Sequence, residues 1–577
     1  MPASKTKKNI IPILGQLKTY DKRTFRFDLV ASINVAVLLV PQAMAYALLA
    51  GVPPIYGLYT ALIPLFVYAI LGSTPQLSVG PVAVSALLLL AGLSKLAEPG
   101  TEQYISLAIT CGLLIGIIQV ILSIFRMGYL ANFLSHPVIA GFTSAAAVII
   151  SLSQLKDVFG ISVASSASMV ETIKHLFENI GSTNIATLLI ALCSMVLIFI
   201  LKKINKSIPG TLIAVVIATL CAYFLKLDSA GVALVEDVPR GLPSIILPDF
   251  RLETIRILIP TLITVTIVGI VESISIAKAL ESKHKSYTIR PNQELLALGA
   301  AKILGSLFQA IPSSASFSRS ALNSDSRAKT TFSSIFAAIF VALVLLFFTP
   351  VFYFLPKAVL AAIIILSVIS LFDYKEAKHL WKTHKKDFWI MAVTFISCFF
   401  FGIDHGVFIG VTLSIFTILF NTSNPHIATL GNIPGTTYYR NLERFAESEG
   451  IVDMLIVRFD EQLYFGNSSN FTKRIYGLAT SQEDKAVTKV LLDASNISSI
   501  DSSGIHALKD LDDSLEAVNI DLYLCGAHGP VRDILKISGL MTEPDKHHLT
   551  IHECIRFLEG KRTLDGDNKA MQNNLDE

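Results

Sequence analysis

The sequence predicts an all-α polytopic membrane domain followed by a small α/β domain, and three observations support this prediction. Of the 577 residues, 52% are hydrophobic and 16% are charged, whereas a soluble protein carries about a quarter charged residues. Apolar runs long enough to cross a bilayer extend from residue 28 to residue 424. After residue 435 the chain is charged, and short β-type runs alternate with helical patterns.

The apolar runs form about fourteen segments, several of them short or broken. The expected spans are 28–48, 53–72, 76–93, 105–125, 133–155, 183–202, 209–226, 256–279, 292–309, 313–323, 331–350, 357–372, 386–403 and 405–422. Basic residues gather on alternate connections, for example at Lys22, Lys202, Lys283 and Lys375. The positive-inside rule then predicts a multi-pass protein of the cell membrane with both termini in the cytoplasm.

The remaining composition excludes several other classes of protein. Residues 1–27 are basic and lack an apolar core with a cleavage site, so we expect a cytoplasmic N-terminal segment and no secretory signal. The six cysteines are scattered, which argues against a disulfide framework or a zinc site. The sequence contains no nucleotide-binding loop and no catalytic constellation at a recognised spacing. We therefore expect no enzyme, no metal or other cofactor and no nucleic-acid partner.

The most informative stretch runs from Ile311 to Asn323 and reads IPSSASFSRSALN. Pro312 followed by two serines is a helix-start signal. A helix that begins at membrane depth directs free N–H groups and the positive end of its dipole at a point where an anion can bind. Arg319 adds a permanent charge, and an ionisable residue inside a membrane indicates function by default.

A second stretch, Ser78 to Ser85, offers a similar start at Gly80-Pro81. It lies in the third expected segment, and Pro312 opens the tenth, seven spans later. An odd separation reverses the topology, so the spacing predicts an inverted repeat with two half-helices facing one site. The alternative is that both prolines begin ordinary helices at the membrane surface, which leaves the apolar setting of Arg319 without explanation.

Glu272 is an acidic residue deep in the eighth segment. It lies about 24 Å along a helix that starts near Ile257, and it shares a helix face with Ser275 and Ile276. A carboxylate removed from water holds a proton more readily and could couple transport to protons. Structural pairing with Lys278 or Arg319 is an equally good interpretation. A sodium site is less favoured, because one carboxylate offers too few oxygen ligands.

Four motifs in order resemble the SulP family of anion transporters, and the likeness covers nearly the whole chain. They are Pro41–Tyr59 (PQAMAYALLAGVPPIYGLY), Gly80-Pro81, Glu272-Ser273-Ile274 and Ser316–Asn323 (SFSRSALN). The resemblance implies two inverted seven-segment repeats, divided into a core part and a gate part, with the anion held between segments three and ten. It also implies a homodimer. Members of the family carry sulfate, bicarbonate, chloride, oxalate or dicarboxylates.

The region 435–560 resembles a STAS domain, and residues 561–577 form a polar tail that we expect to be disordered. The resemblance rests on Leu492-Asp493-Ala494-Ser495, on Ile500 to Ile505 (IDSSGI) and on Ile537-Ser538-Gly539-Leu540. In related anti-sigma-factor antagonists the first serine of DSSG is phosphorylated, which corresponds to Ser502. Cytoplasmic regulatory proteins could then act at this domain.

The sequence therefore predicts a secondary active transporter of inorganic anions that takes up sulfate together with protons. Transport of bicarbonate or a dicarboxylate, or an exchanger or channel of the same fold, are the alternatives. A membrane-tethered signalling protein is disfavoured, because it would not need matched half-helices and Arg319. We expect membrane lipid as a further partner and Glu272 as the proton-coupling residue. The expected substrate-binding residues are Gln42, Tyr46, Val82, Ala83, Ser314, Ala315, Ser316, Phe317, Ser318 and Arg319.

Overall fold

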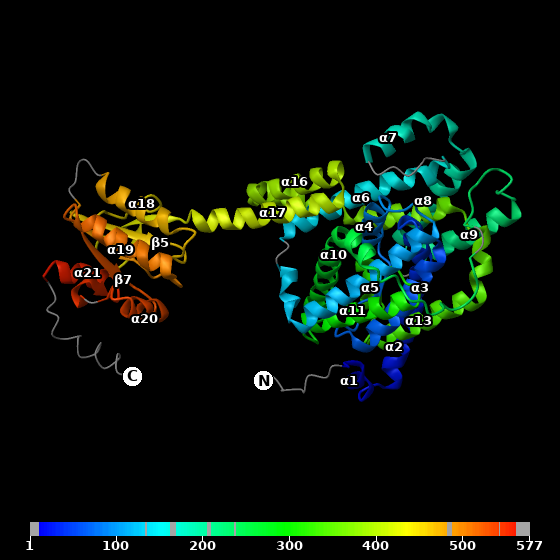
Figure 1. Ribbon diagram of the computed structural model, residues 1–577, viewed down its shortest axis with the longest axis horizontal. Helices are drawn as coiled ribbons and strands as arrows, with labels where there is room; N and C mark the ends of the chain where they lie inside the picture. Colours follow the sequence, from blue (N-terminus) through cyan, green and yellow to red (C-terminus); the bar gives the residue numbers. More distant parts are fainter. Residues whose placement is uncertain are drawn as a thin grey trace. The chain divides into compact units, whose positions relative to one another are not determined.

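The computed structural model describes residues 11–132, 135–161, 169–204, 209–235, 238–481, 487–541 and 543–560. The tail 561–577, which the sequence predicts to be disordered, lies outside the described residues. The chain forms two compact units, Met1–Ser414 and Ile415–Glu577. The first unit is helical, and the second is built on a sheet (Figure 1).

Each predicted apolar segment corresponds to a helix or to a short strand followed by a helix. In order, they are α2 (Lys22–Leu49), α3 (Pro54–Leu71), β1 (Val79–Gly80) with α4 (Ala83–Leu93), α5 (Glu102–Ile124), α6 (His136–Phe159), α8 (Ile185–Ile204), α9 (Gly210–Phe224), α10 (Leu252–His284), α11 (Pro291–Leu307), β2 (Ser314–Ala315) with α12 (Phe317–Asp325), α13 (Phe332–Leu343) with η3 (Val344–Phe348) and η4 (Thr349–Phe354), α14 (Lys357–Val368), α16 (Lys385–Phe401) and α17 (Ile403–Ser423). Among the described residues, eight helices are long and apolar enough to cross a membrane.

The sequence missed several short elements. They are α1 (Ile13–Leu17), η1 (Met127–Asn132), α7 (Met169–Glu178), η2 (Ile180–Ser182) and α15 (Tyr374–Thr383), whereas η5 (Ile369–Leu371) falls at the end of the predicted span 357–372. None is long enough to cross a bilayer, so a search for membrane spans passes over them. The first span also begins earlier than predicted, because Asp21 caps α2 by accepting a hydrogen bond from the Thr24 N–H at 2.8 Å. Part of the expected N-terminal segment 1–27 is therefore helix.

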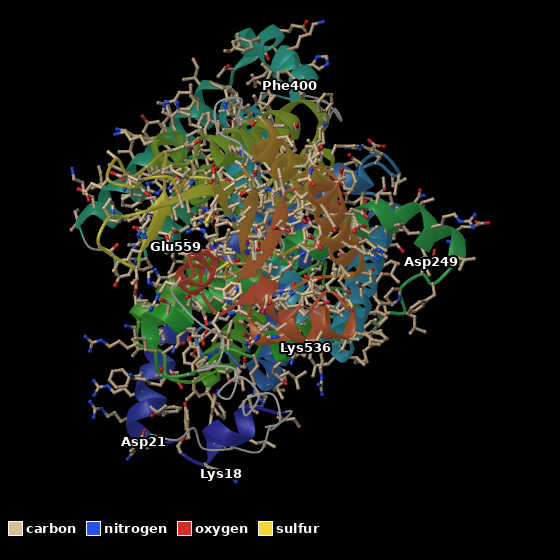
Figure 2. All side chains as sticks on the ribbon, turned by 90° about the vertical axis from the view of Figure 1, so that its left-hand side faces the viewer. Lys18, Asp21, Asp249, Phe400, Lys536 and Glu559 are labelled. Carbon is tan, nitrogen blue, oxygen red and sulfur yellow. The ribbon has the colours of Figure 1, made fainter. Side chains whose placement is uncertain are left out.

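The helices of the first unit pack closely where small residues meet. At the crossing of α5 and α11, a Cβ atom added to Gly116 would lie 2.8 Å from the Gly299 carbonyl oxygen, and the reverse distance is 2.7 Å. Glycine at both positions lets the two backbones touch. Figure 1 shows these two helices near α10, which contacts both of them. Large apolar side chains such as Phe400 of α16 project outward (Figure 2), as expected for a lipid-facing surface.

The second unit is an α/β domain with a six-stranded sheet in the order β4-β3-β5-β6-β7-β8. Its strands are β3 (Ile427–Asn432), β4 (Tyr439–Asn441), β5 (Met454–Phe459), β6 (Lys489–Asp493), β7 (Asp521–Cys525) and β8 (His547–His548). Its helices are α18 (Ser468–Thr480), α19 (Ser502–Glu516), α20 (Gly529–Ile537), η6 (Pro544–Lys546) and α21 (Ile551–Leu558). Strands β5, β6 and β7 are parallel, and β3 pairs antiparallel with β5. The sheet therefore begins at Ile427, before the predicted start of the domain at 435.

Candidate anion-binding site

The two predicted half-helices start from one short sheet. Strands β1 and β2 pair antiparallel, with Val79 opposite Ala315 and Gly80 opposite Ser314. The Ser316 N–H extends the pairing by donating to the Ser78 carbonyl at 3.0 Å. Backbone groups in apolar surroundings need such partners, because no solvent can satisfy them there. Because the pairing is antiparallel, α4 and α12 begin at opposite ends of this strand pair, although about 230 residues separate the two helices in the chain.

The N-termini of the two helices differ in their capping. The N-cap residue of α4 is Val82, which offers no side-chain acceptor. The first backbone bond of this helix runs from the Ala86 N–H to the Val82 carbonyl, so the preceding N–H groups remain available to a ligand. In α12, Ser316 Oγ accepts from the Arg319 N–H at 3.5 Å. Both N-termini carry the positive ends of helix dipoles.

Arg319 is the largest fully buried side chain of the described chain, with an exposed fraction of 0%. Its Nη1 donates to Gln42 Oε1 at 3.4 Å, and Gln42 Nε2 donates to Ser367 Oγ at 3.3 Å. Its Nε and Nη2 have no partner in the described structure. A Cβ added to Gly80 would lie 3.3 Å from Nη2, so the guanidinium lies against β1. A buried cation with two unfilled donors is costly unless an anion binds there.

Helix α10 contacts the same strand pair through Glu272 and Ser273. Glu272 Oε2 accepts from Ser314 Oγ at 3.5 Å. Ser273 Oγ lies 3.0 Å from Ser314 Oγ and accepts from the Ala315 N–H at 3.2 Å. Glu272 and Arg319 form no direct ion pair in the described part of the chain, so structural pairing of these two groups is not the arrangement seen here.

Most other residues of the predicted site are buried near this strand pair, whereas the side chains of two are exposed. Gln42 and Tyr46 lie one turn apart on α2, with exposed fractions of 2% and 5%. Val82 and Ala83, which begin α4, are also buried, as are Ser314, Ala315 and Ser316. Phe317 is 61% exposed, and Ser318 is exposed with its hydroxyl 3.3 Å from Ser316 Oγ. The structure therefore brings the residues together, apart from the side chain of Phe317.

Sequence reasoning missed the contact residue of α10. It placed Ser275 on the face of Glu272, but Ser275 is exposed and Ser273 makes the contacts to β2. Spacing cannot decide between the two serines, because the rotation of α10 about its axis is set by packing. The available signal was the place of Ser273 in the motif Glu272-Ser273-Ile274, which carries part of the family resemblance.

Sequence reasoning also passed over Lys302 of α11, which is buried with an exposed fraction of 4%. Its ammonium donates to Gln119 Oε1 at 3.0 Å. Within the described residues it forms no ion pair with a carboxylate.

Two interrupted helices that meet at a short sheet, with a buried arginine beside them, are typical of secondary transporters that bind an anion inside the membrane. The fold and the site define the protein as a multi-pass membrane transporter. The chain belongs to the Sulfate permease family, whose sequence profile matches residues 25–394. The profile of the STAS domain matches residues 445–554.

Two plant proteins illustrate this relationship. Sulfate transporter 4.1, chloroplastic, of Arabidopsis thaliana is 37% identical over 579 residues, which cover 96% of this chain and 84% of the relative. High affinity sulfate transporter 2 of Stylosanthes hamata is 34% identical over 568 residues, with coverages of 95% and 86%. Both relatives match across the membrane unit and the STAS domain.

Solved structures agree with the fold. The murine Solute Carrier 26 family member A9 (Slc26a9) anion transporter, in the inward-facing state, superimposes with a TM-score of 0.88 at 28% identity and covers 97% of this chain and 96% of its own. The transmembrane domain of a cyanobacterium bicarbonate transporter, BicA, gives a TM-score of 0.59 at 22% identity. It covers 69% of this chain and 98% of its own, and it supports the fold alone.

Proposed function

We propose that this protein is a secondary active transporter that moves sulfate into the cell together with protons. The observation that carries the proposal is the fully buried Arg319, whose Nε and Nη2 lack partners beside two helix N-termini. A tetrahedral oxyanion can accept from a guanidinium edge and from backbone N–H groups at the same time. The sulfate transporters among the relatives support this choice of anion.

In this proposal the anion sits between the starts of α4 and α12. The N–H groups that begin α4 and the free donors of Arg319 bind its oxygen atoms. Gln42 orients the guanidinium, and Tyr46, Ala315 and Ser318 line the approach to the site. The hydroxyl of Ser314 connects the site to Glu272.

Glu272 is the proposed proton carrier. Moving a divalent anion and an ionised carboxylate together through a low-dielectric barrier is costly. A proton on Glu272 offsets one negative charge during the inward step. Ser314 Oγ lies 3.5 Å from Glu272 Oε2, so a change in the charge of Glu272 alters the hydrogen bond that Ser314 of β2 makes.

The test uses purified protein in liposomes with radiolabelled sulfate and an imposed pH gradient. We expect uptake to rise as the external pH falls. Glu272→Gln, which mimics the protonated carboxyl, should keep sulfate binding and lose pH-driven accumulation, while anion-for-anion exchange persists. Glu253→Gln is the matched control, because Glu253 lies at the exposed start of the same helix.

Three outcomes would contradict parts of the proposal. Uptake by Glu272→Gln that still rises with external acidity would remove Glu272 as the coupling residue. Native uptake that needs sodium and ignores pH would remove proton coupling. Faster uptake of labelled bicarbonate or succinate than of sulfate would change the substrate.

The family resemblance supports a homodimer in the cell membrane with both termini in the cytoplasm. In the STAS domain, Ser502 is the exposed first residue of α19, and Asp501 caps that helix by accepting from the Gly504 N–H at 2.8 Å. A phosphate on Ser502 would lie at a helix N-terminus, where negative charge is stabilised. We propose Ser502 as a regulatory phosphorylation site for cytoplasmic partner proteins.

A further inference from the structure

Helix α15 is a short helix between the membrane-spanning segments, and one of its faces is fixed to the first unit. Ala377 and Leu380 pack with Ala140 of α6 and Met391 of α16. This contact holds α15 directly before α16, which begins at Lys385. The helix is therefore a fixed part of the unit, and its other face is available to the surroundings.

The exposed side of α15 and the first turns of α16 carry a basic aromatic patch. We define this patch as Tyr374, Lys378, Trp381, Lys382, Lys385 and Trp389, all of which are exposed. Tyr374, Lys378 and Trp381 follow helical spacing on α15 and so lie along one side of it, and Lys385 begins α16 one residue after the break at His384. The Lys385 ammonium lies 5.9 Å from the centre of the Trp381 ring. Cations and aromatic rings thus alternate on one surface.

The charge of this surface is positive, and its lysines are concentrated in one run. Residues 378–386 read KHLWKTHKK, with four lysines, two histidines and no carboxylate. The acidic residues just before them have other roles. Asp373 caps α15 by accepting from the Glu376 N–H at 3.0 Å, and Glu376 lies 3.4 Å from His136. With Asp387 of α16 included, residues 373–389 carry five lysines and three carboxylates, so this stretch keeps a net charge of +2 with neutral histidines.

The aromatic residues place the patch at the edge of a bilayer. Trp381 and Trp389 are the only two tryptophans among the 577 residues, and they are 48% and 58% exposed. Phe388 lies between them, with ring centres 4.8 Å from Trp381 and 5.8 Å from Trp389. Tryptophan is enriched where headgroups meet hydrocarbon, and a half-exposed ring has one side to bury there.

We propose that the basic aromatic patch binds the phosphate headgroups of anionic lipids in the leaflet that surrounds α16. Lysines on an amphipathic helix next to a membrane span attract acidic lipids. A protein partner fits less well, because the patch continues into α16, whose following residues are an apolar membrane segment. The proposal is independent of which anion the protein transports.

The two tryptophans make the site directly measurable in the full-length protein. Vesicles of phosphatidylcholine would contain either brominated phosphatidylglycerol or the same fraction of brominated phosphatidylcholine, since bromine quenches nearby tryptophan. We expect the anionic lipid to bind about five-fold more strongly than the zwitterionic lipid. Added salt should reduce this preference, because exposed charges are screened. Trp381→Phe and Trp389→Phe would assign the signal to one ring.

The decisive variant combines Lys378→Gln, Lys382→Gln and Lys385→Gln and should bring the preference close to one. The ratio of the two quenchers within one variant cancels any direct effect of Lys385 on Trp381. The matched control combines Lys473→Gln, Lys509→Gln and Lys536→Gln, which remove three exposed lysines of the STAS domain. Lys536 is labelled in Figure 2.

The control variant should keep the native preference for the anionic lipid. Equal quenching by both lipids in the native protein would overturn the proposal. So would a preference that survives in the triple variant of the patch.

Discussion

Arg319 in the membrane unit and Asp460 in the STAS domain are both charged groups largely removed from solvent. They differ in how completely their hydrogen-bonding atoms are satisfied by the protein. Asp460 accepts hydrogen bonds from Arg458 and Asn496 and contacts the His426 ring at 2.9 Å. Arg319 makes one long bond, to Gln42, and keeps two donors without a protein partner. A satisfied charge stabilises a fold, whereas an unsatisfied one is suited to a ligand.

The two half-helices repeat this contrast on a smaller scale. Ser316 Oγ accepts a hydrogen bond from one N–H of α12, whereas Val82 offers no side-chain acceptor to the first turn of α4. The donors without protein partners therefore come from one side chain of α12 and from the backbone of α4. Five substitutions test these two contrasts, and they are ordered from the largest expected effect on sulfate binding or transport to the smallest.

Arg319→Met should have the largest effect. It removes the charge while keeping much of the volume, so sulfate affinity should fall by a factor of about 100. Stability without sulfate should stay the same or rise, because a buried charge with unfilled donors is lost. Thermal unfolding with and without sulfate measures both effects. Arg256→Met, at an exposed position of α10, is the control. If the same sulfate concentrations stabilised Arg319→Met and the native protein, Arg319 would be excluded from the site.

Gly80→Ala should have a moderate effect on transport. The added methyl would lie 3.3 Å from Arg319 Nη2, so the guanidinium must move by a few tenths of an ångström. We expect the KM for sulfate to rise about five-fold, equivalent to about 1 kcal/mol. In the control Gly477→Ala, the new methyl meets nothing within 4 Å, and the KM should not change. An unchanged KM in Gly80→Ala would show that the position of the guanidinium is not critical.

Val82→Ser adds a side-chain acceptor at the N-terminus of α4, and Ser316→Ala removes the one at the N-terminus of α12. A serine at position 82 can accept from the first turn of α4 and would compete with the anion, so sulfate affinity should fall about three-fold. Ser316→Ala should instead lower stability by about 1 kcal/mol and leave the affinity nearly unchanged. Isothermal titration and thermal unfolding separate the two effects. Equal losses of affinity in both variants would mean that α4 and α12 contribute alike.

Asp460→Asn should leave sulfate transport unchanged and alter only the acid stability of the STAS domain. Burial opposes ionisation, but hydrogen bonds from Arg458, His426 and Asn496 outweigh it and lower the pKa of Asp460 to about 2. The unfolded value is about 3.9, so this group stabilises the domain above about pH 4, and the contribution is lost as the pH falls toward 2.

The variant should be about 1–2 kcal/mol less stable than the native domain at pH 7. The two proteins should converge near pH 2. Hydrogen exchange of β5 and β6 in the full-length protein measures the difference, and Asp521→Asn, at an exposed position of β7, is the control. A difference that persists unchanged at low pH would assign the effect to packing and not to charge.

The sequence predicted those features that follow from local pattern. Runs of apolar residues identified the membrane segments, because the thickness of a bilayer sets their length. The signal at Gly80-Pro81 lies just before α4, which begins at Ala83, whereas α12 begins at Phe317 and not at the predicted Pro312-Ser313, because Ser314 and Ala315 pair as a strand with β1. Alternating strand and helix patterns predicted a small α/β domain, and β5, β6 and β7 with the helices between them confirm it, because local propensities specify such elements.

The tertiary structure alone decided which side chains meet. Ser273, and not Ser275, contacts β2, because packing sets the rotation of α10. Only the pairing of β1 with β2 brings Arg319 against Gly80, and only the count of its partners reveals its free donors. The early start of the sheet at β3 likewise depends on pairing with β5. The physical reason is the same in each case: a local pattern specifies an element, but contacts between distant residues determine which groups are left unsatisfied.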